Sequence, residues 1–207
     1  MKVRNVFIGL ALVICTAAIT SKVVSDDKDK KPAPPANDPK MQAMIKYGTP
    51  GENHKKLEPL VGHWTCAGKM WDAPDQTPTE ITATADYEWA LGNRFLMSHV
   101  QGGAMPGMPA FEGMGVMGYD NFRQQYVTGW VDNMNTAVFT STGKVDATGK
   151  VFTFTGKADD ASTGKKDQTF RSVMTLNSND KITEEMYGPG PDGKEFKAME
   201  IVYTRAK

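Results

Sequence analysis

The sequence predicts an all-β protein, a single antiparallel up-and-down β-barrel of about ten strands with a short N-terminal helix. From about residue 63 onward, apolar and polar residues alternate with a period of two in segments rich in β-branched and aromatic side chains. Gly, Asn, Asp and Pro separate these segments, as tight turns require. Almost no segment in this region has the spacing of an amphipathic helix, so strands should account for most of the fold.

We expect strands at about 63–71, 79–89, 93–101, 111–119, 124–132, 136–143, 150–157, 167–177, 181–187 and 195–205. The links between them are short, and short links join only antiparallel neighbours. Consecutive pairing makes a meander, which leaves no exposed edge if it closes on itself. The second segment shows the alternation best, because one face would carry Ile81, Ala83, Ala85, Tyr87 and Trp89.

Residues 1–25 have the pattern of a secretory signal peptide or an N-terminal anchor. Lys2 and Arg4 precede an apolar run over residues 6–19. That run is shorter than the roughly 20 apolar residues that a transmembrane helix needs. We therefore expect an exported protein, periplasmic or extracellular, which an uncleaved segment would tether to the membrane.

Small residues permit cleavage of this segment after Ala18 or after Ser25. A lipoprotein signal, in which Cys15 would be lipidated, is the alternative. Ile14 stands where such signals have a small residue, so ordinary cleavage fits better.

Residues 26–53 link this segment to the barrel domain, which we place at 54–207. The first part of the link is dense in charged residues and proline and cannot bury a core, so it should be a semi-extended tether. A short helix follows, with Asp38 as its N-cap and Pro39 at its first position, and it should end near residues 48–50.

Charge and cysteine content limit the partners and the chemistry. The chain has 24 basic and 24 acidic residues, and cleavage after Ser25 would leave 21 and 24, a net charge of −3. This balance gives no electrostatic reason to expect nucleic acid or an anionic membrane surface as a partner of the folded domain. Cys66 would be the remaining cysteine, so we expect no intrachain disulfide and interpret Cys66 as an apolar filler rather than a reactive thiol.

Five pieces of the sequence, in order, carry a resemblance to a known family. They are 62–64 (Gly-His-Trp), 91–96, 111–113 with 118–120, 130–132 and 199–205. The first looks like the Gly-x-Trp motif of lipocalins and their calycin relatives, and over residues 54–206 the chain is similar to the bacterial domain-of-unknown-function family 1579, DUF1579. The resemblance implies a lipocalin-like fold and no assigned activity.

Gly62, Trp64 and Arg205 should form the structural signature of the barrel. In the resembling families an arginine near the end of the last strand packs across the tryptophan of the first. A guanidinium over an indole contributes about 0.5 to 2 kcal/mol, and its N–H groups can also bind carbonyls of the closing strand. If Trp64 points inward, the period of two places Cys66 inside as well, where a thiol reagent should reach it slowly.

The sequence contains no recognisable catalytic or metal-binding motif. None of His54, His63 and His99 has a metal-ligand spacing, and we expect no cofactor and no metal. His63 should face outward, whereas His99 could line the interior and ligate haem, a role that a lone strand histidine seldom has. A pair of carboxylates inside the barrel could act as acid and base, although exposed strand faces account for most strand carboxylates, here Glu88, Asp132, Glu184, Glu185 and Glu200.

The loop at 102–109 is the most distinctive local feature, because it combines Gly and Pro with Met105 and Met108. A simple mobile connection at one barrel end is the plainest interpretation. Methionine adapts to apolar shapes, so a lid over a ligand is the second. Thioethers are soft ligands, so a copper(I) site is the third.

Four further residues mix aromatic and charged character, as pocket walls do, and we expect them in the lumen or at its mouth: Arg94, Tyr119, Trp130 and Asp132. With Met105 and Met108 they are the candidate ligand-binding residues. The function that fits best is an exported, non-enzymatic barrel that binds a small apolar or amphipathic ligand. The alternatives are a structural or interaction protein with a filled barrel, an enzyme using lumen carboxylates, and a copper(I) binder.

Overall fold

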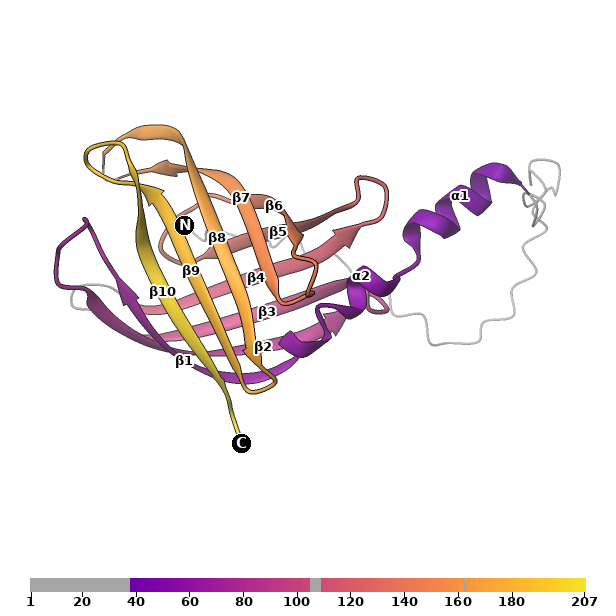
Figure 1. The fold of residues 1–207 in the computed structure, drawn as a ribbon, viewed down its shortest axis with the longest axis horizontal. Helices are drawn as coiled ribbons and strands as arrows, with labels where there is room; N and C mark the ends of the chain where they lie inside the picture. Colours follow the sequence, from indigo (N-terminus) through magenta and orange to yellow (C-terminus); the bar gives the residue numbers. More distant parts are fainter. Residues whose placement is uncertain (1–37, 105–108, 162) are drawn as a thin grey trace, which may run out of the picture. The chain divides into compact units, whose positions relative to one another are not determined.

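Ten antiparallel strands close into one barrel in the computed structural model, which describes residues 38–104, 109–161 and 163–207. The strands are β1 (Gly62–Met70), β2 (Thr79–Ala90), β3 (Phe95–Ala104), β4 (Ala110–Asp120), β5 (Gln125–Asp132), β6 (Phe139–Val145), β7 (Val151–Asp160), β8 (Lys165–Ser178), β9 (Lys181–Pro189) and β10 (Glu195–Arg205). Each pairs with its neighbour in sequence, and β1 pairs with β10 to close the ring. The predicted fold class and meander are confirmed (Figure 1).

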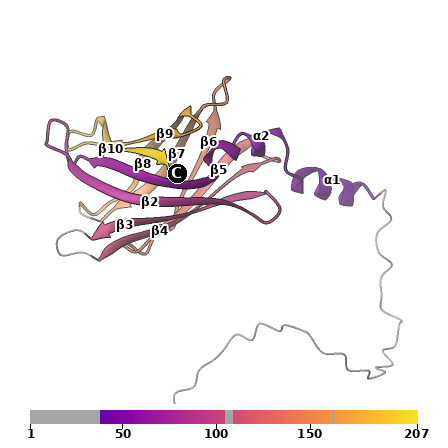
Figure 2. The same cartoon turned by 90° about the horizontal axis from the view of Figure 1, so that it is seen from below.

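Three short helical segments precede the barrel: α1 (Pro39–Gly48), α2 (Glu52–Lys55) and η1 (Glu58–Leu60), a 3₁₀ turn. The start of α1 is as predicted, because the Asp38 side chain accepts a hydrogen bond from the N–H of Lys40 and Pro39 is the first helical residue. Sequence analysis missed α2 and η1. Figure 2 shows α1 and α2 at the same end of the molecule.

Most strand ends lie within two residues of their expected positions. The exceptions are the ends of β3 and β7, each three residues later than expected, and the start of β6. Strand β6 begins at Phe139, where a strand from residue 136 was expected. Side chains of the preceding loop explain the delay, since Asp132 accepts from the N–H of Met134 and the amide of Asn135, and Asn135 accepts from the N–H of Ala137. These bonds hold the backbone in consecutive turns and keep it out of the sheet.

The register assigns one face of every strand to the interior. Trp64 pairs with Ala85 of β2 and with Arg205 of β10, and the inward positions then follow every second residue around the ring. The buried core lies on this face and gathers toward the helical end, with Leu57, Leu60, Trp64, Leu96, Tyr126 and Phe152 as its largest fully buried side chains. The two ends of the barrel are therefore built differently.

Among the described residues, no helix is long and apolar enough to span a bilayer.

Candidate functional site: the barrel lumen

The end of the barrel next to α2 is closed by side chains. Leu57 and Leu60, which α2 and η1 position, are almost wholly buried against Trp64 and the rest of the core. An unbroken series of edge-on aromatic contacts continues the seal across the interior, from His54 through Tyr119 and Tyr126 to Phe152. Such contacts add to the free energy gained from burial alone. Buried side chains of the described residues therefore fill this end.

Trp64 and Arg205 hold the closed end together as predicted. The Arg205 guanidinium lies 4.2 Å from the centroid of the Trp64 ring, and the indole N–H donates to the carbonyl of Leu60 at 2.9 Å. Arg205 also donates to three carbonyls, those of Val61, Pro59 and Asn179. The predicted stacking is confirmed. The carbonyls that Arg205 binds belong to the residues leading into β1 and to the turn between β8 and β9.

Buried His54 belongs to this seal. Its Nδ1 accepts from the N–H of Gly51 at 3.1 Å, which requires that nitrogen to be unprotonated. Burial, and after it the charge of Arg94, lowers the pKa of His54. His54 is therefore a neutral structural residue.

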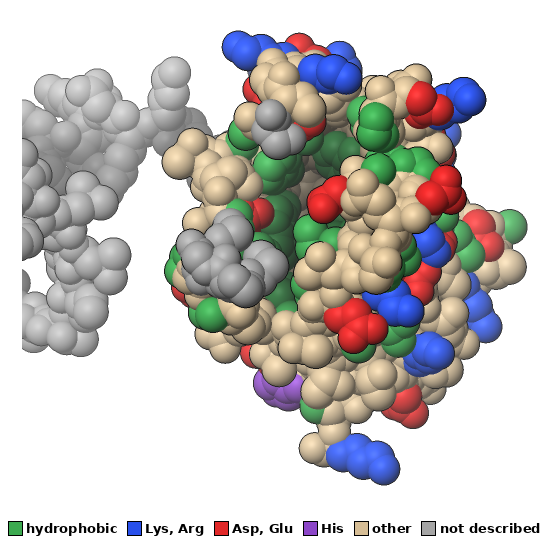
Figure 3. Space-filling model, turned by 90° about the vertical axis from the view of Figure 1, so that its left-hand side faces the viewer, with side chains coloured by type: hydrophobic (Ala, Val, Ile, Leu, Met, Phe, Trp, Pro, Cys, Tyr) green, Lys and Arg blue, Asp and Glu red, His purple; other side chains and the backbone are tan. Residues whose placement is uncertain are grey.

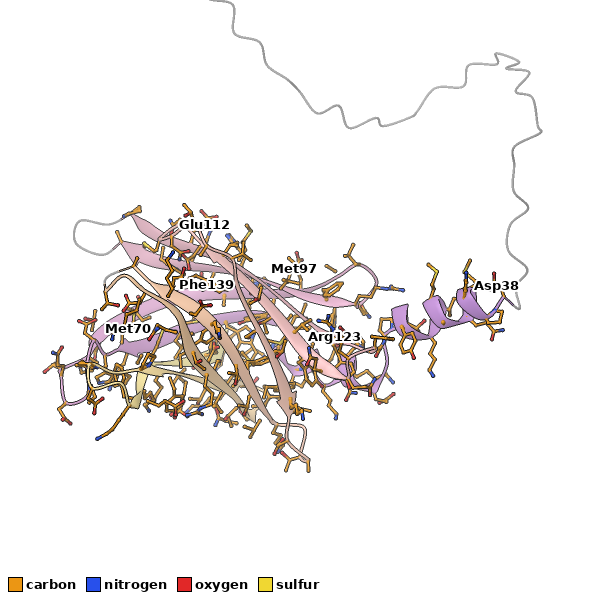
Figure 4. All side chains as sticks on the ribbon, turned by 90° about the horizontal axis from the view of Figure 1, so that it is seen from above. Asp38, Met70, Met97, Glu112, Arg123 and Phe139 are labelled. Atoms are coloured by element: carbon orange, nitrogen blue, oxygen red, sulfur yellow. The ribbon has the colours of Figure 1, made fainter. Side chains whose placement is uncertain are left out.

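The opposite end of the barrel is hollow. Figure 3 shows a depression at this end whose walls are green with apolar side chains and which continues into the molecule. Figure 4 places Met70 toward this end and Arg123 toward the end that carries α1. Apolar residues at inward register positions stay partly exposed here, in contrast to the buried core at the closed end, and they include Ile81, Phe111, Trp130, Phe139, Phe170, Met186, Met199 and Ile201.

Inward glycines widen the hollow and let aromatic rings lie flat on the sheet. The Trp130 ring covers Gly113 and Gly115 and stacks on Phe111, with ring centroids 6.3 Å apart and planes 14° apart. The Phe170 ring lies against Gly156, and Ile81 against Gly68. A Cβ would overlap the covering side chain at Gly113, Gly68 and Gly156, and the Ser98 hydroxyl at Gly115, so the glycines determine how the wall packs.

A polar cluster interrupts the apolar wall at mid-height. The Glu184 carboxylate accepts from the hydroxyl of Ser172 at 2.9 Å and from the hydroxyl of Tyr203 at 2.8 Å. Glu184 pairs in register with Met174 and Ile201, so its side chain shares the inner face, and it remains half-exposed. Across the lumen a second polar contact joins the hydroxyls of Thr128 and Ser141 at 2.6 Å.

This cluster raises the pKa of the neighbouring acids. Burial, and after it the charge of Glu184, raises the pKa of Cys66 to about 12 and holds the pKa of Tyr87 and of Tyr203 well above 10. These groups are neutral at physiological pH. The prediction that Cys66 is a buried, unreactive thiol agrees with its 7% exposed fraction.

The structure separates the candidate ligand-binding residues into two groups. Trp130 and Asp132 lie at the open end, where the Trp130 indole N–H donates to Asp132 at 2.9 Å. Arg94 and Tyr119 lie at the closed end, and Arg94 is exposed in the β2–β3 turn, where it donates to the carbonyls of Leu91 and Gly92. The four residues therefore do not form one pocket. Met105 and Met108 fall outside the described residues.

Arg94 and Tyr119 border a shallow pocket of about 280 Å³ on the outside of the closed end, together with His54 and Asp120. Its charged groups already have partners in the protein, because Asp120 accepts from the N–H groups of Phe122 and Arg123 and Arg94 holds its own turn. We therefore consider the apolar lumen the better candidate site.

The expectation that His99 could line the interior is wrong. His99 pairs with Asp86, whose partner His63 is exposed, so all three lie on the outer face. His99 contacts Glu112 at 3.0 Å, and His63 contacts Asp86, which agrees with the outward orientation predicted for His63. Among the described residues, no group of three or more His, Cys, Asp or Glu side chains is arranged to hold a metal ion.

The strand carboxylates named from the sequence differ in the face of the barrel that they occupy and in their partners. Glu185 and Glu200 face outward and both bind Lys197, and Glu88 is exposed. Asp132 accepts hydrogen bonds from the Trp130 indole N–H and from the N–H of Met134 in the following turn. Glu184, which sequence analysis grouped with surface carboxylates, faces the lumen. The alternation over residues 182–186 contains the signal, since Ile182 and Met186 are apolar on the same face.

Comparison with known proteins supports the fold. The family model described as "Protein of unknown function (DUF1579)" matches residues 49–205. The structure is similar to Rv2717c from M. tuberculosis, at 17% identity and a TM-score of 0.57, covering 77% of this chain and 100% of that one. It is also similar to the S-type phycobiliprotein lyase CPES from Guillardia theta, at 11% identity and a TM-score of 0.51, covering 76% and 99%. No curated protein matches the sequence.

Proposed function

The chain belongs to the DUF1579 family, whose description assigns no activity, and we propose that its barrel binds a small apolar or amphipathic molecule in the lumen. The observation that carries the proposal is the apolar hollow at the open end (Figure 3). Binding sites for small molecules are concave, mostly apolar and equipped with a few placed polar groups. The half-exposed inner aromatic and aliphatic side chains supply the first two properties, and Glu184 with its hydroxyl partners supplies the third.

The same hollow favours a binding barrel over a purely structural one. A filled barrel would bury its inward side chains at both ends, whereas here the buried core gathers at one end. The inward Ile81 and Trp130 keep part of their surface exposed. Exposed apolar surface inside a concavity gains free energy when a ligand covers it, at roughly 25 cal/mol per Å².

We also propose that the protein is exported, on the pattern of residues 1–25. A lumen ligand would then be taken up outside the cytoplasm. The intact mass of the protein isolated from its own cells would identify the mature N-terminus, and a mass that retains residues 1–25 in a protein recovered from the cytoplasm would contradict export.

Titration with the neutral apolar fluorophore N-phenyl-1-naphthylamine tests the binding proposal. We expect saturable enhancement of its emission and energy transfer from Trp130, which lies in the lumen wall. Ile81→Trp places a larger side chain at an inward position, and we expect it to weaken binding about tenfold, which corresponds to roughly 1.4 kcal/mol.

The matched control is Thr82→Trp, which adds the same side chain one residue away on the exposed outer face. It should leave the dissociation constant within about twofold of the wild-type value. Absence of saturable binding by the wild-type protein, or equal weakening by both variants, would count against a lumen site. Circular dichroism should show the same β-sheet spectrum for all three proteins.

A further inference from the structure

We propose that the lumen selects amphiphiles with a protonated amine head group, and that Glu184 is the residue that pairs with it. The inference rests on the proposed function and deepens it, because it assigns the chemical class of the ligand. It starts from the position of Glu184, a carboxylate at an inward register position between Met174 and Ile201.

The partners of Glu184 occupy only part of its hydrogen-bonding capacity. Both carboxylate oxygens accept one hydrogen bond each, one from Ser172 and one from Tyr203. Each oxygen can accept more than one bond, so the head group of a ligand has acceptor sites left. The side chain is half-exposed although it faces inward, which means that the lumen reaches it.

Within residues 38–104, 109–161 and 163–207, no Lys, Arg or His lies within 4.0 Å of the Glu184 carboxylate. The other ion pairs of these strands lie elsewhere. On the outer face Lys197 binds Glu185 and Glu200 and Arg171 binds Glu195, and at the closed end Arg205 pairs with Asp180. The described partners of Glu184 are therefore neutral hydroxyls, and a cationic head group that reached the carboxylate would add a charge-assisted hydrogen bond to the two it already accepts.

The charge around the lumen points to the same class. After burial, the charge of Glu184 contributes to the raised pKa of Cys66 and of Tyr203, so this carboxylate acts on groups at its depth of the lumen. Figure 3 shows further acidic side chains on both sides of the hollow. A fatty acid entering tail-first or head-first would bring a like charge into this field, whereas an alkylammonium ion would be attracted.

The position of Glu184 also fits an amphiphile with a single polar end. Ile201, Met186 and Met199 surround it on neighbouring inward positions, so a ligand bound at the carboxylate would place its apolar part along these side chains. Methionine side chains adapt to different apolar shapes. The site would then be specific for the charge of the head group and would tolerate different shapes of the apolar tail.

Displacement of bound N-phenyl-1-naphthylamine by three twelve-carbon amphiphiles, each below its micelle concentration, tests the inference on the full chain. The amphiphiles are dodecylamine, dodecanol and dodecanoate, which share a tail and differ in head-group charge. We expect the amine to bind about 10- to 100-fold more tightly than the alcohol, the range of a charged hydrogen bond, and the carboxylate to bind most weakly.

Glu184→Gln keeps the shape of the side chain and removes its charge. We expect this variant to lose the preference for the amine over the alcohol, with the affinity for each amphiphile taken relative to the variant's own affinity for the fluorophore. The matched control is Glu185→Gln, on the adjacent outward position, which should keep the full preference. Fluorophore binding by each variant verifies that its lumen is intact.

The outcomes separate the two proposals. If the fluorophore does not bind to the wild type, the proposed function fails. If it binds but the three amphiphiles displace it equally, or if Glu184→Gln retains the amine preference, the lumen site stands and the amine inference is overturned.

Discussion

At the scale of single residues, the interior of the barrel contains acids that burial keeps neutral beside one carboxylate. Cys66, Tyr87 and Tyr203 are acids whose pKa values are raised by burial and by the nearby carboxylate. Glu184 is that carboxylate, and it accepts two hydroxyl hydrogen bonds. The arrangement concentrates negative charge at one depth of the lumen, where the rest of the wall is apolar.

Cys66 gives a residue-scale prediction. With a pKa of about 12, nearly all of the folded thiol is protonated at pH 8, and only the thiolate reacts with an alkylating reagent. We expect iodoacetamide to modify Cys66 at least about 100-fold more slowly in the native protein than in urea, as measured by peptide mass spectrometry, which separates Cys66 from Cys15. Comparable rates in the two states would mean that Cys66 is not inside.

The same shift has a defined effect on stability. The folded pKa is raised above that of the unfolded thiol, so the proton is held more tightly in the folded state. The stabilisation from Cys66 is therefore complete below the unfolded value, about 8.5, and is lost as the pH rises toward 12.

Sequence periodicity predicted correctly that Cys66 faces the interior, but it did not place Glu184 there. It placed Cys66 inside, because a period of two from Trp64 requires it, and this is confirmed. It grouped Glu184 with surface carboxylates, because a carboxylate on a strand is usually solvated and the hydroxyl partners, Ser172 and Tyr203, come from two other strands. Hydrogen bonds between strands distant in sequence leave no local pattern.

At the scale of the strands, glycine decides how the wall is built. Gly143 on β6 faces the interior, and a Cβ there would overlap the carbonyl oxygen of Thr153 and approach the Phe154 ring to 2.6 Å. A backbone oxygen in a paired strand cannot move away without breaking the ladder. The strand pair β6–β7 therefore needs a residue without a side chain at this position.

Substitution of this glycine gives an element-scale prediction. We expect Gly143→Ala to lower the free energy of unfolding by about 1–3 kcal/mol, the usual cost of overpacking, in urea denaturation followed by circular dichroism. Gly188→Ala on β9 is the control, since no atom lies within 4 Å of its added Cβ, and its effect should stay within about 0.5 kcal/mol. Equal losses for the two variants would mean that close approach is not the reason for Gly143.

The elements that sequence analysis missed are the shortest. A helix of four residues and a 3₁₀ turn of three have too few positions for a helical period to emerge. They form because Leu57 and Leu60 are buried by the barrel end, and Trp64 and Arg205 bind the carbonyls of the turn. Tertiary contacts, which the local sequence does not display, stabilise them.

At the scale of the whole molecule, closure of the ring depends on contacts between its first and last strands. Arg205 lies at the end of β10, stacks on Trp64 of β1 and binds carbonyls before β1 and between β8 and β9. One side chain thus joins the two ends of the sheet and the plug beneath them. Loss of this side chain should loosen the closed end while the strand pairing elsewhere remains.

Arg205→Lys tests this whole-molecule role. Lysine keeps the charge but loses the planar fork that reaches several carbonyls and stacks on the indole. We expect the free energy of unfolding to fall by about 2 kcal/mol, measured by urea denaturation. The exposed Arg123→Lys, at a turn that makes no such contacts with β1, should change it by no more than about 0.5 kcal/mol, and a similar small value for Arg205→Lys would contradict the role.

The sequence by itself determined the strand order, the meander and the inward face, since all three follow from the two-residue period and from turns whose residues adjoin in the chain. The family resemblance implied that Arg205 packs across Trp64, and closure of the ring makes their two strands neighbours. Only the tertiary structure decided that one end is plugged and the other hollow, and that Glu184 meets Ser172 and Tyr203 inside. Those outcomes depend on contacts between side chains that are far apart in the sequence and become neighbours only when the ring closes.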